Sequence, residues 1–190
     1  LCRLYEWAAV RCDDSCFGLH LAEQVDLNLF DVVGYAAAHS RDLREAWERA
    51  IRYFRLWCTG SHLSLERPSS GNFRMIYRNI LPAPHDAYRH DAEFTLALIY
   101  LASLRLTGEH WQPTEVRFAH GMPGDNVCGE LARVFGPAPL AFDGSANWIE
   151  GPLHVLDLPN RNADPNLLLL VERHAERLLH DASPGARAEE

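Results

Sequence analysis

The sequence lacks the long apolar stretch that a membrane-spanning helix needs. Its longest uncharged apolar run covers residues 94–104, whereas a helix needs about 20 apolar residues to cross a bilayer. Arg3, Glu6 and Arg11 interrupt the first twelve residues, so these residues are no secretory signal peptide, which has an unbroken apolar centre. We therefore expect a soluble, cytoplasmic protein without contact to a membrane.

Basic residues are scarce relative to acidic ones. The formal net charge is −8, which argues against a chain that grips nucleic acid by itself, because phosphate binding needs a basic face. The charge is still compatible with a separate, basic DNA-binding domain elsewhere in the same protein.

The signatures of catalysis and metal binding are also missing. The sequence contains no Gly-x-Ser-x-Gly elbow, no phosphate-binding glycine loop and no His-Glu-x-x-His motif. The ten histidines do not pair with cysteines or carboxylates at metal-ligand spacing. Five scattered cysteines, an odd number, indicate reduced thiols rather than a disulfide framework. We expect no enzyme activity, no metal and no cofactor.

What is present is the material for one globular domain. The chain has 190 residues, 47% of them hydrophobic, and a chain of this size buries roughly 70% of its unfolded surface. We predict a domain over residues 1–182. Residues 183–190, with Pro184 and Gly185, are predicted to be a linker or a frayed tail.

Apolar spacing predicts several helices. The clearest runs from about Arg41 to Trp57, with Ser40 as its expected N-cap and apolar residues at three- and four-residue steps. A long helix over 86–106 is apolar over much of its circumference and ends at Gly108; such a helix is buried on several sides or serves a subunit interface. Asp164-Pro165 starts the last helix. Shorter helices are predicted at 4–12, 17–24 and 125–135.

Alternating residues predict the strands. Residues 62–66 and 73–78 have the period of two that half-buried strands show, and the turn-forming residues 68–72 join them into a hairpin. Further strands are expected at 114–120, 140–143 and 147–150. The order of these elements predicts an α+β fold, a single domain in which several helices flank a small, mainly antiparallel sheet.

Five short motifs follow one another in an order typical of a known family. They are Phe17-Gly18-Leu19-His20, Gly34-Tyr35-Ala36, Trp111-x-Pro113, Val134-Phe135-Gly136 and Ala163-Asp164-Pro165. The series resembles the effector-binding domain, often called the arabinose-binding-like domain, of AraC-family transcription regulators. The resemblance implies a regulatory domain that binds a small-molecule effector, forms a homodimer and controls an attached helix-turn-helix domain. The DNA-binding domain is expected to be missing from this chain. Trp148 departs from the pattern, since the family usually has smaller or aliphatic residues there.

Two arginines suggest an anion site. Arg74 and Arg78 are four apart on a predicted strand, so they point to the same face about 13 Å apart. They could grip two separate anionic groups, such as the phosphates of a nucleotide messenger, in the manner of some cyclic-dinucleotide sensors. Two exposed arginines without a ligand explain the pattern as well. His120 is interpreted either as a histidine that hydrogen-bonds a neighbouring loop or as a pocket residue.

We predict a ligand pocket between the sheet and the long helix. Its lining is expected to include Tyr53, Trp57, Arg74, Arg78, Arg117, His120 and Trp148. Two other functions stay open. A pure dimerisation module would explain the apolar 86–106 helix, and an enzyme of unknown type would need a catalytic signature that the sequence does not show.

Overall fold

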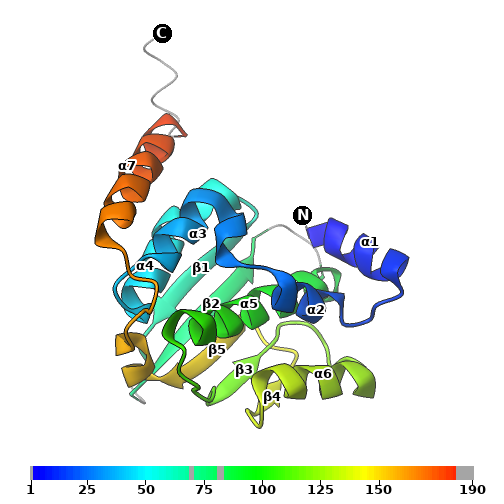
Figure 1. Cartoon of the computed structure of the whole chain (residues 1–190). Helices are drawn as coiled ribbons and strands as arrows, with labels where there is room; N and C mark the ends of the chain where they lie inside the picture. The colour runs from blue at the N-terminus through cyan, green and yellow to red at the C-terminus, as the bar shows by residue number, and fades with distance from the viewer. Residues whose placement is uncertain (1, 69–70, 81–83, 183–190) are drawn as a thin grey trace.

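Figure 1 shows the fold of the chain in a computed structural model, which describes residues 2–68, 71–80 and 84–182. The predicted tail 183–190 and the centre of the predicted hairpin turn, residues 69–70, lie outside the described residues. The helices are α1 (Cys2–Cys12), α2 (Phe17–Gln24), α3 (Asp31–Ala38), α4 (Leu43–Trp57), α5 (Arg89–Thr107), α6 (Asp125–Phe135) and α7 (Pro165–Asp181). Three short 3₁₀ turns are η1 (Leu27–Phe30), η2 (His85–Tyr88) and η3 (Leu153–Asp157).

The strands form one sheet in the order β1-β2-β5-β3-β4. They are β1 (Ser61–Glu66), β2 (Asn72–Asn79), β3 (Glu115–Arg117), β4 (Leu140–Ala141) and β5 (Asn147–Pro152). All neighbours are antiparallel except β3 and β4. The α+β fold with a small, mainly antiparallel sheet and the β1–β2 hairpin are therefore confirmed.

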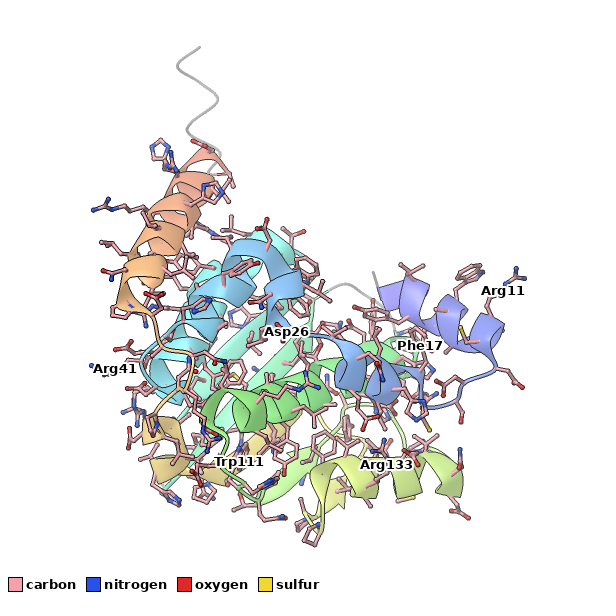
Figure 2. All side chains as sticks on the ribbon, viewed as in Figure 1. Arg11, Phe17, Asp26, Arg41, Trp111 and Arg133 are labelled. Atoms are coloured by element: carbon pink, nitrogen blue, oxygen red, sulfur yellow. The ribbon has the colours of Figure 1, made fainter. Side chains whose placement is uncertain are left out.

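Helix α5 is the centre of the core. One face of the sheet packs on α5 through the alternate residues Phe73, Met75 and Tyr77, which are all buried. Helix α2 covers another side of α5. Trp111, labelled in Figure 2, fills the space beside α5 and donates its indole N–H to Ser103. The apolar residues around α5 are thus buried by other parts of the same chain, as expected for a deeply buried helix. It gives no reason for a subunit interface on α5.

Several predicted boundaries were wrong because side chains found other partners. Ser40 does not cap α4; its hydroxyl donates to the carbonyl of Ala36 at 2.7 Å and closes α3, while Asp42 caps α4 by accepting from the Glu45 N–H at 2.9 Å. Helix α5 begins at Arg89 rather than at residue 86, because residues 85–88 form η2. Asp86 there accepts from the Gly121 N–H instead of capping a helix.

Strands β3 and β4 are shorter than predicted, and β5 is longer. Strand β3 ends at Arg117 instead of residue 120, because the next groups leave the ladder with β5: the Ala119 N–H donates to the Asn147 side chain at 2.8 Å, and the Phe118 carbonyl accepts from the Gly144 N–H. Strand β4 stops at Ala141, and β5 continues to Pro152. The helix α3 and the turn η1 have no counterpart in the prediction.

The last helix, α7, packs beside α3 and α4 and points away from the sheet (Figure 1). Asp164 caps it through two backbone N–H groups and Pro165 is its first residue, as predicted. Leu168, Ala175 and Leu179 of α7 form a small second core with residues of α3 and α4. In the described part of the chain, no helix is both long and apolar enough to cross a membrane.

Candidate functional site: an apolar pocket with one acidic end

A cavity of about 100 Å³ lies between α3, α4, α5 and the β1–β2 edge of the sheet. The predicted location, between the sheet and the long helix, agrees with this cavity. Cavities of roughly 150 Å³ with aliphatic and aromatic walls bind molecules as small as benzene. The lining is mostly apolar; it includes Leu27, Val33, Gly34, Ala37, Trp47, Ala50, Phe54, Leu63, Leu98 and Ile99.

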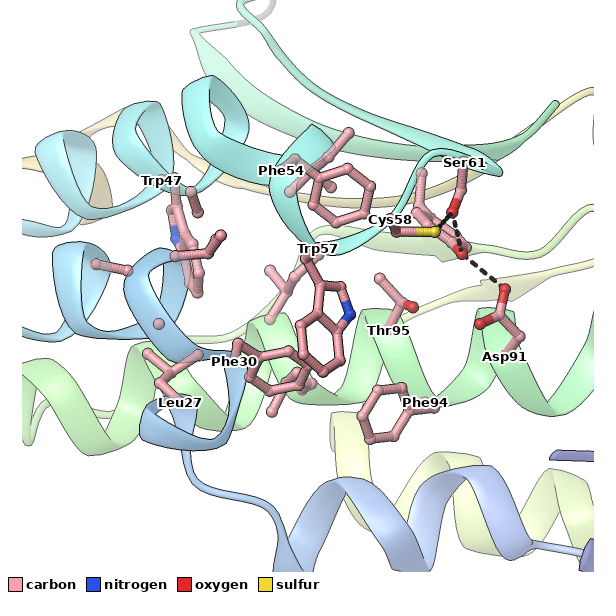
Figure 3. Close-up of a pocket in the computed structure, with 18 of the residues that line it drawn as sticks. Leu27, Phe30, Trp47, Phe54, Trp57, Cys58, Ser61, Asp91, Phe94 and Thr95 are labelled. Atoms are coloured by element: carbon pink, nitrogen blue, oxygen red, sulfur yellow. Dashed lines mark hydrogen bonds between the residues drawn. The ribbon is translucent and has the colours of Figure 1, made fainter. Parts of the chain in front are cut away.

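Aromatic rings form the outer wall of the pocket. Trp57, the last residue of α4, is 41% exposed and meets Phe30 edge-on, with 4.9 Å between the ring centroids. Phe94 of α5 lies next along the wall, 6.4 Å from Phe30 and 5.4 Å from Tyr5 of α1. Figure 3 shows Trp57, Phe30 and Phe94 gathered at one side of the cavity. The partly exposed Trp57 ring therefore lies where the pocket meets the surface.

One end of the pocket, beside Trp57 and Phe94, is polar (Figure 3). The hydroxyl of Tyr77 donates to a carboxylate oxygen of Asp91 at 2.6 Å, and the Asn79 amide donates to the same oxygen at 2.8 Å. Ser61 lies 3.0 Å from the Tyr77 hydroxyl and 3.0 Å from the Cys58 sulfur, which makes a continuous hydrogen-bonded chain (Figure 3). Among the described lining residues Asp91 carries the only charge, and none is basic.

Two of the predicted site residues lie on α4, on different faces. Trp57 lines the pocket. Tyr53 points toward α7, is 1% exposed and donates its hydroxyl to Glu176 at 2.8 Å. Burial and the neighbouring Glu176 carboxylate raise the pKa of Tyr53 to about 12. Tyr53 therefore connects α4 to α7 and does not line the cavity.

Three other predicted residues meet on the far face of the sheet. The guanidinium groups of Arg74 and Arg117 stack on Trp148, 4.6 and 4.8 Å from the ring centroid. Each arginine also pairs with a carboxylate, Arg74 with Glu150 at 2.6 Å and Arg117 with Glu115 at 2.8 Å. Because strand residues alternate between faces, this cluster is separated from the pocket by the sheet.

Arg78 is exposed near the end of β2, the strand that also carries Arg74. The Glu150 carboxylate already neutralises Arg74, so the two arginines do not present a matched pair of free guanidinium groups.

His120 lies in a third place, a buried ionisable cluster at the start of α5. Its Nδ1 donates to the Gly121 carbonyl at 2.8 Å, which agrees with a histidine that bonds a neighbouring loop. Its Nε2 finds no hydrogen-bond partner among the described residues and is 3.7 Å from the carboxylate of Glu93. Burial raises the pKa of Glu93 to about 7 and lowers the pKa of the adjacent His90 to about 4.

Of the lining residues, the sequence analysis identified only Trp57; those that it missed include Phe30, Asp91, Phe94 and Thr95. One signal was available for Asp91: it is an acidic residue on a helix whose circumference is otherwise largely apolar, and a buried carboxylate on such a helix needs a polar partner. Nothing local indicated that Phe30 would meet Trp57, because η1 was not predicted.

Comparison with known proteins identifies the family. Residues 1–160 match the model described as the arabinose-binding domain of AraC transcription regulators, N-terminal. The chain belongs to this family. It is thus an N-terminal regulatory domain of an AraC-type transcription regulator, as the order of the five motifs predicted.

Two matches are to proteins from Pseudomonas aeruginosa, one by sequence and one by fold. The ornithine utilization regulator is 28% identical over 173 residues, which are 90% of this chain and 49% of that protein. The crystal structure of the transcriptional regulator CdpR matches with a TM-score of 0.65 at 18% identity, over 88% of this chain and 60% of that chain. The AraC-type domain therefore spans about half the length of the curated relative, and the likeness to CdpR shows the fold alone.

Proposed function

We propose that this AraC-type domain senses a small, largely apolar molecule in the pocket between α3, α4 and α5. The observation that supports this most is the cavity itself, which has aromatic walls, a partly exposed tryptophan at its edge and hydrogen-bonding groups at one end. Ligand sites of soluble proteins combine a mainly apolar lining with a few polar groups that fix orientation.

The signal has a short physical path to α7. Helices α3 and α4 each present one side to the pocket, through residues such as Ala37 and Phe54, and another side to α7, through Ala36 and Tyr53. An effector that binds one arrangement of these helices better than another shifts the population toward it. A difference of about 1–3 kcal/mol is enough for useful control. A helix-turn-helix domain of the same regulator would receive this signal and contact DNA.

The proposal includes a homodimer. Leu169 and Leu170 are adjacent on α7 and are 49% and 62% exposed. Two large apolar side chains on the outer side of α7 favour contact with a second copy. We place the dimer contact there instead of on α5, whose apolar surface is buried within the protomer.

The name of one relative suggests an effector, ornithine, but the pocket of this chain gives it little support. An amino acid carries a carboxylate, and the described lining residues contain no basic side chain to pair with one. We therefore do not extend ornithine to this domain.

The test fills the pocket and leaves the rest of the domain alone. Ala50 lines the cavity from α4, so Ala50→Leu is expected to occupy the space of a ligand. Toluene and 3-methylbutan-1-ol serve as probes in a thermal-shift titration, where a ligand at a hundred times its Kd adds about 2.7 kcal/mol to stability. The shift should be present in the parent domain and absent in Ala50→Leu.

The matched control is Trp148→Phe, on the far face of the sheet. It should keep the full shift, because the sheet separates Trp148 from the pocket. A shift that survives Ala50→Leu but disappears in Trp148→Phe would move the site to the arginine–tryptophan cluster. A stable dimer that responds to no probe would favour the dimerisation module.

A further inference from the structure

One polar group of the pocket, the hydroxyl of Thr95, is left over by the hydrogen bonds of the described chain. We propose that this hydroxyl recognises the effector, and that the effector is an uncharged molecule with one hydroxyl or carbonyl oxygen on a short apolar group. The oxygen bonds to Thr95, and the apolar group fills the rest of the cavity. This inference rests on the proposed function and specifies the class of effector.

The side chain of Thr95 differs from the other short hydroxyl side chains of α5. Serine and threonine in a helix often donate to a carbonyl one turn earlier. Ser103 does so with the Tyr100 carbonyl at 2.6 Å, and Thr107 with the Ser103 carbonyl at 2.8 Å. The Thr95 hydroxyl bonds to none of the described residues. Its hydrogen-bonding capacity is therefore available to a molecule in the cavity.

The Thr95 oxygen also has access to the cavity. Thr95 is half-buried and belongs to the lining. The polar side-chain atoms of the described chain that are sealed in the core without a partner lie on Arg44, His120 and Trp148. Because Thr95 is not one of these residues, its unpaired hydroxyl reaches open space instead of being enclosed by protein.

The other polar side chains at this end of the pocket are engaged within the protein. Asp91 accepts from Tyr77 and Asn79 and has a further interaction. Ser61 lies 3.0 Å from the Tyr77 hydroxyl. A ligand competes with protein groups for these atoms, whereas it meets no such competition from the described residues at Thr95.

The position of Thr95 suits a molecule with one polar end. Thr95 follows Asp91 by one turn of α5, and Leu98 follows about one turn later; all three line the cavity, because residues three and four apart share a helix face. Figure 3 shows Thr95 in the same part of the cavity as Trp57 and Asp91. An oxygen bound at Thr95 therefore leaves the attached carbon atoms beside the apolar residues of the next turn, which rises about 5.4 Å along the helix.

A neutral ligand fits this site better than a carboxylate or a plain hydrocarbon. A buried charge costs far more than a buried hydroxyl unless an opposite charge compensates it. The described lining residues include no arginine, lysine or histidine, so a carboxylate would lose its hydration without a cationic partner. A hydrocarbon avoids this cost, but it covers the Thr95 hydroxyl without bonding to it, and a buried polar group without a partner is unfavourable.

The experiment compares ligands of nearly equal size. Phenol and toluene differ only by a hydroxyl in place of a methyl group, and phenol is neutral at pH 7, because phenols titrate near the tyrosine value of about 10. The second pair is 3-methylbutan-1-ol and 3-methylbutanoate. Dissociation constants are measured by calorimetry on the whole 190-residue chain. We expect the alcohol of the second pair to bind and the acid to show no binding.

The decisive variant is Thr95→Val, which removes the hydroxyl and keeps the branched shape of the side chain. It should weaken the binding of phenol relative to toluene by about five- to tenfold, the contribution of one neutral hydrogen bond. The ratio is the readout, because a general loss of packing weakens both ligands and leaves their ratio unchanged. Thr95→Ser keeps the hydroxyl and should restore the ratio of the parent. If Thr95→Val does not fold, Thr95→Ala provides the same comparison.

The matched control is Thr114→Val, the same change at an exposed threonine directly before β3 and outside the lining. It should leave both dissociation constants as they are in the parent.

The outcomes separate this inference from the proposed function. If Thr95→Val leaves the ratio of phenol to toluene binding unchanged, or if 3-methylbutanoate binds as tightly as the alcohol, the role of Thr95 is overturned and the pocket remains a sensor of apolar molecules. If no ligand binds the parent chain, or if Ala50→Leu leaves their binding intact, the pocket itself is rejected as the effector site.

Discussion

At the scale of single residues, Glu93 is the most unusual group in the domain. It is fully buried on α5, and the groups that face it are Arg89 at 3.1 Å, His90 and His120 at 3.7 Å, and the more distant Glu6. Burial outweighs the attraction of Arg89 and raises the pKa of Glu93 to about 7. A buried carboxyl that titrates near neutral pH makes stability depend on pH.

The sign of that dependence follows from the direction of the shift. Between about pH 4.5, the ordinary value, and pH 7 the folded state holds a proton on Glu93 that the unfolded state has lost. Stability from this group is therefore lost as the pH rises through that window. His90 acts in the opposite direction, because its pKa is lowered to about 4 and the unfolded chain takes up its proton first as the pH falls below 6.5.

We predict that Glu93→Gln removes the first effect and leaves the second. As the pH rises from 5 to 8, the parent should lose about 1–3 kcal/mol of unfolding free energy through Glu93, and the variant should not show this loss. Urea unfolding at a series of pH values measures this directly. Glu48→Gln, an exposed glutamate, provides the baseline. Parallel curves for Glu93→Gln and the parent would show that Glu93 does not titrate in this range.

At the scale of elements, the join between η1 and α3 shapes the pocket. A side chain on Gly34 would place its Cβ 1.7 Å from the carbonyl oxygen of Leu27, so the two segments approach each other only because residue 34 is glycine. Leu27 and Phe30, which η1 supplies to the pocket wall, depend on that close approach.

Two alanine substitutions in helices should therefore have opposite effects. Gly34→Ala is expected to destabilise the domain by about 3 kcal/mol through overpacking and to abolish probe binding. Gly129→Ala in α6, where the new methyl group meets open space, should stabilise it by about 0.5–1 kcal/mol. Thermal melts with and without 3-methylbutan-1-ol compare the two. Equal effects at both positions would contradict the assigned packing of η1.

The elements that the sequence predicted well are those with local signals. The start of α7 is marked by two neighbouring residues, the cap Asp164 and the proline that follows it. The β1–β2 hairpin is marked by the alternation of apolar and polar residues within each strand. Helix α3 was missed because it is buried on almost all sides, through residues such as Val32, Ala36 and Ala37, so that its sequence shows no apolar stripe. The end of β3 depends on hydrogen bonds to residues more than twenty positions away, which no local pattern reports.

The site was harder to predict than the fold for a related reason. Its lining comes from residues between Tyr5 and Ile99 on α1, η1, three helices and two strands, so it exists only after the long-range packing is known. The polar and aromatic residues chosen from the sequence are instead divided among the pocket, the far face of the sheet, the contact of Tyr53 with α7 and the buried cluster of His120, while Arg78 is exposed. Charge and aromaticity identify residues that need partners, but they do not say which partners.

At the scale of the whole molecule, α3 and α4 form a layer between the pocket and α7. The contact with α7 is partly polar, since Glu176 accepts from Tyr53 at 2.8 Å and Glu172 pairs with Arg49 at 2.8 Å. Helix α6 contacts α2 and α5 instead. A ligand that orders the layer should therefore reach α7 and leave α6 almost unaffected.

Amide hydrogen exchange can measure this route. A pocket ligand such as 3-methylbutan-1-ol should slow exchange in α3, α4 and α7, because ordering one side of a packed layer lowers the rate of local opening on the other. Tyr53→Phe removes one buried hydrogen bond, worth about 1 kcal/mol, so it should speed exchange in α7 several-fold and reduce the protection of α7 by the ligand. Helix α6 is the internal control. Protection confined to the pocket residues would show that α7 does not read the pocket, and the signal of the regulator would have to leave the domain by another surface.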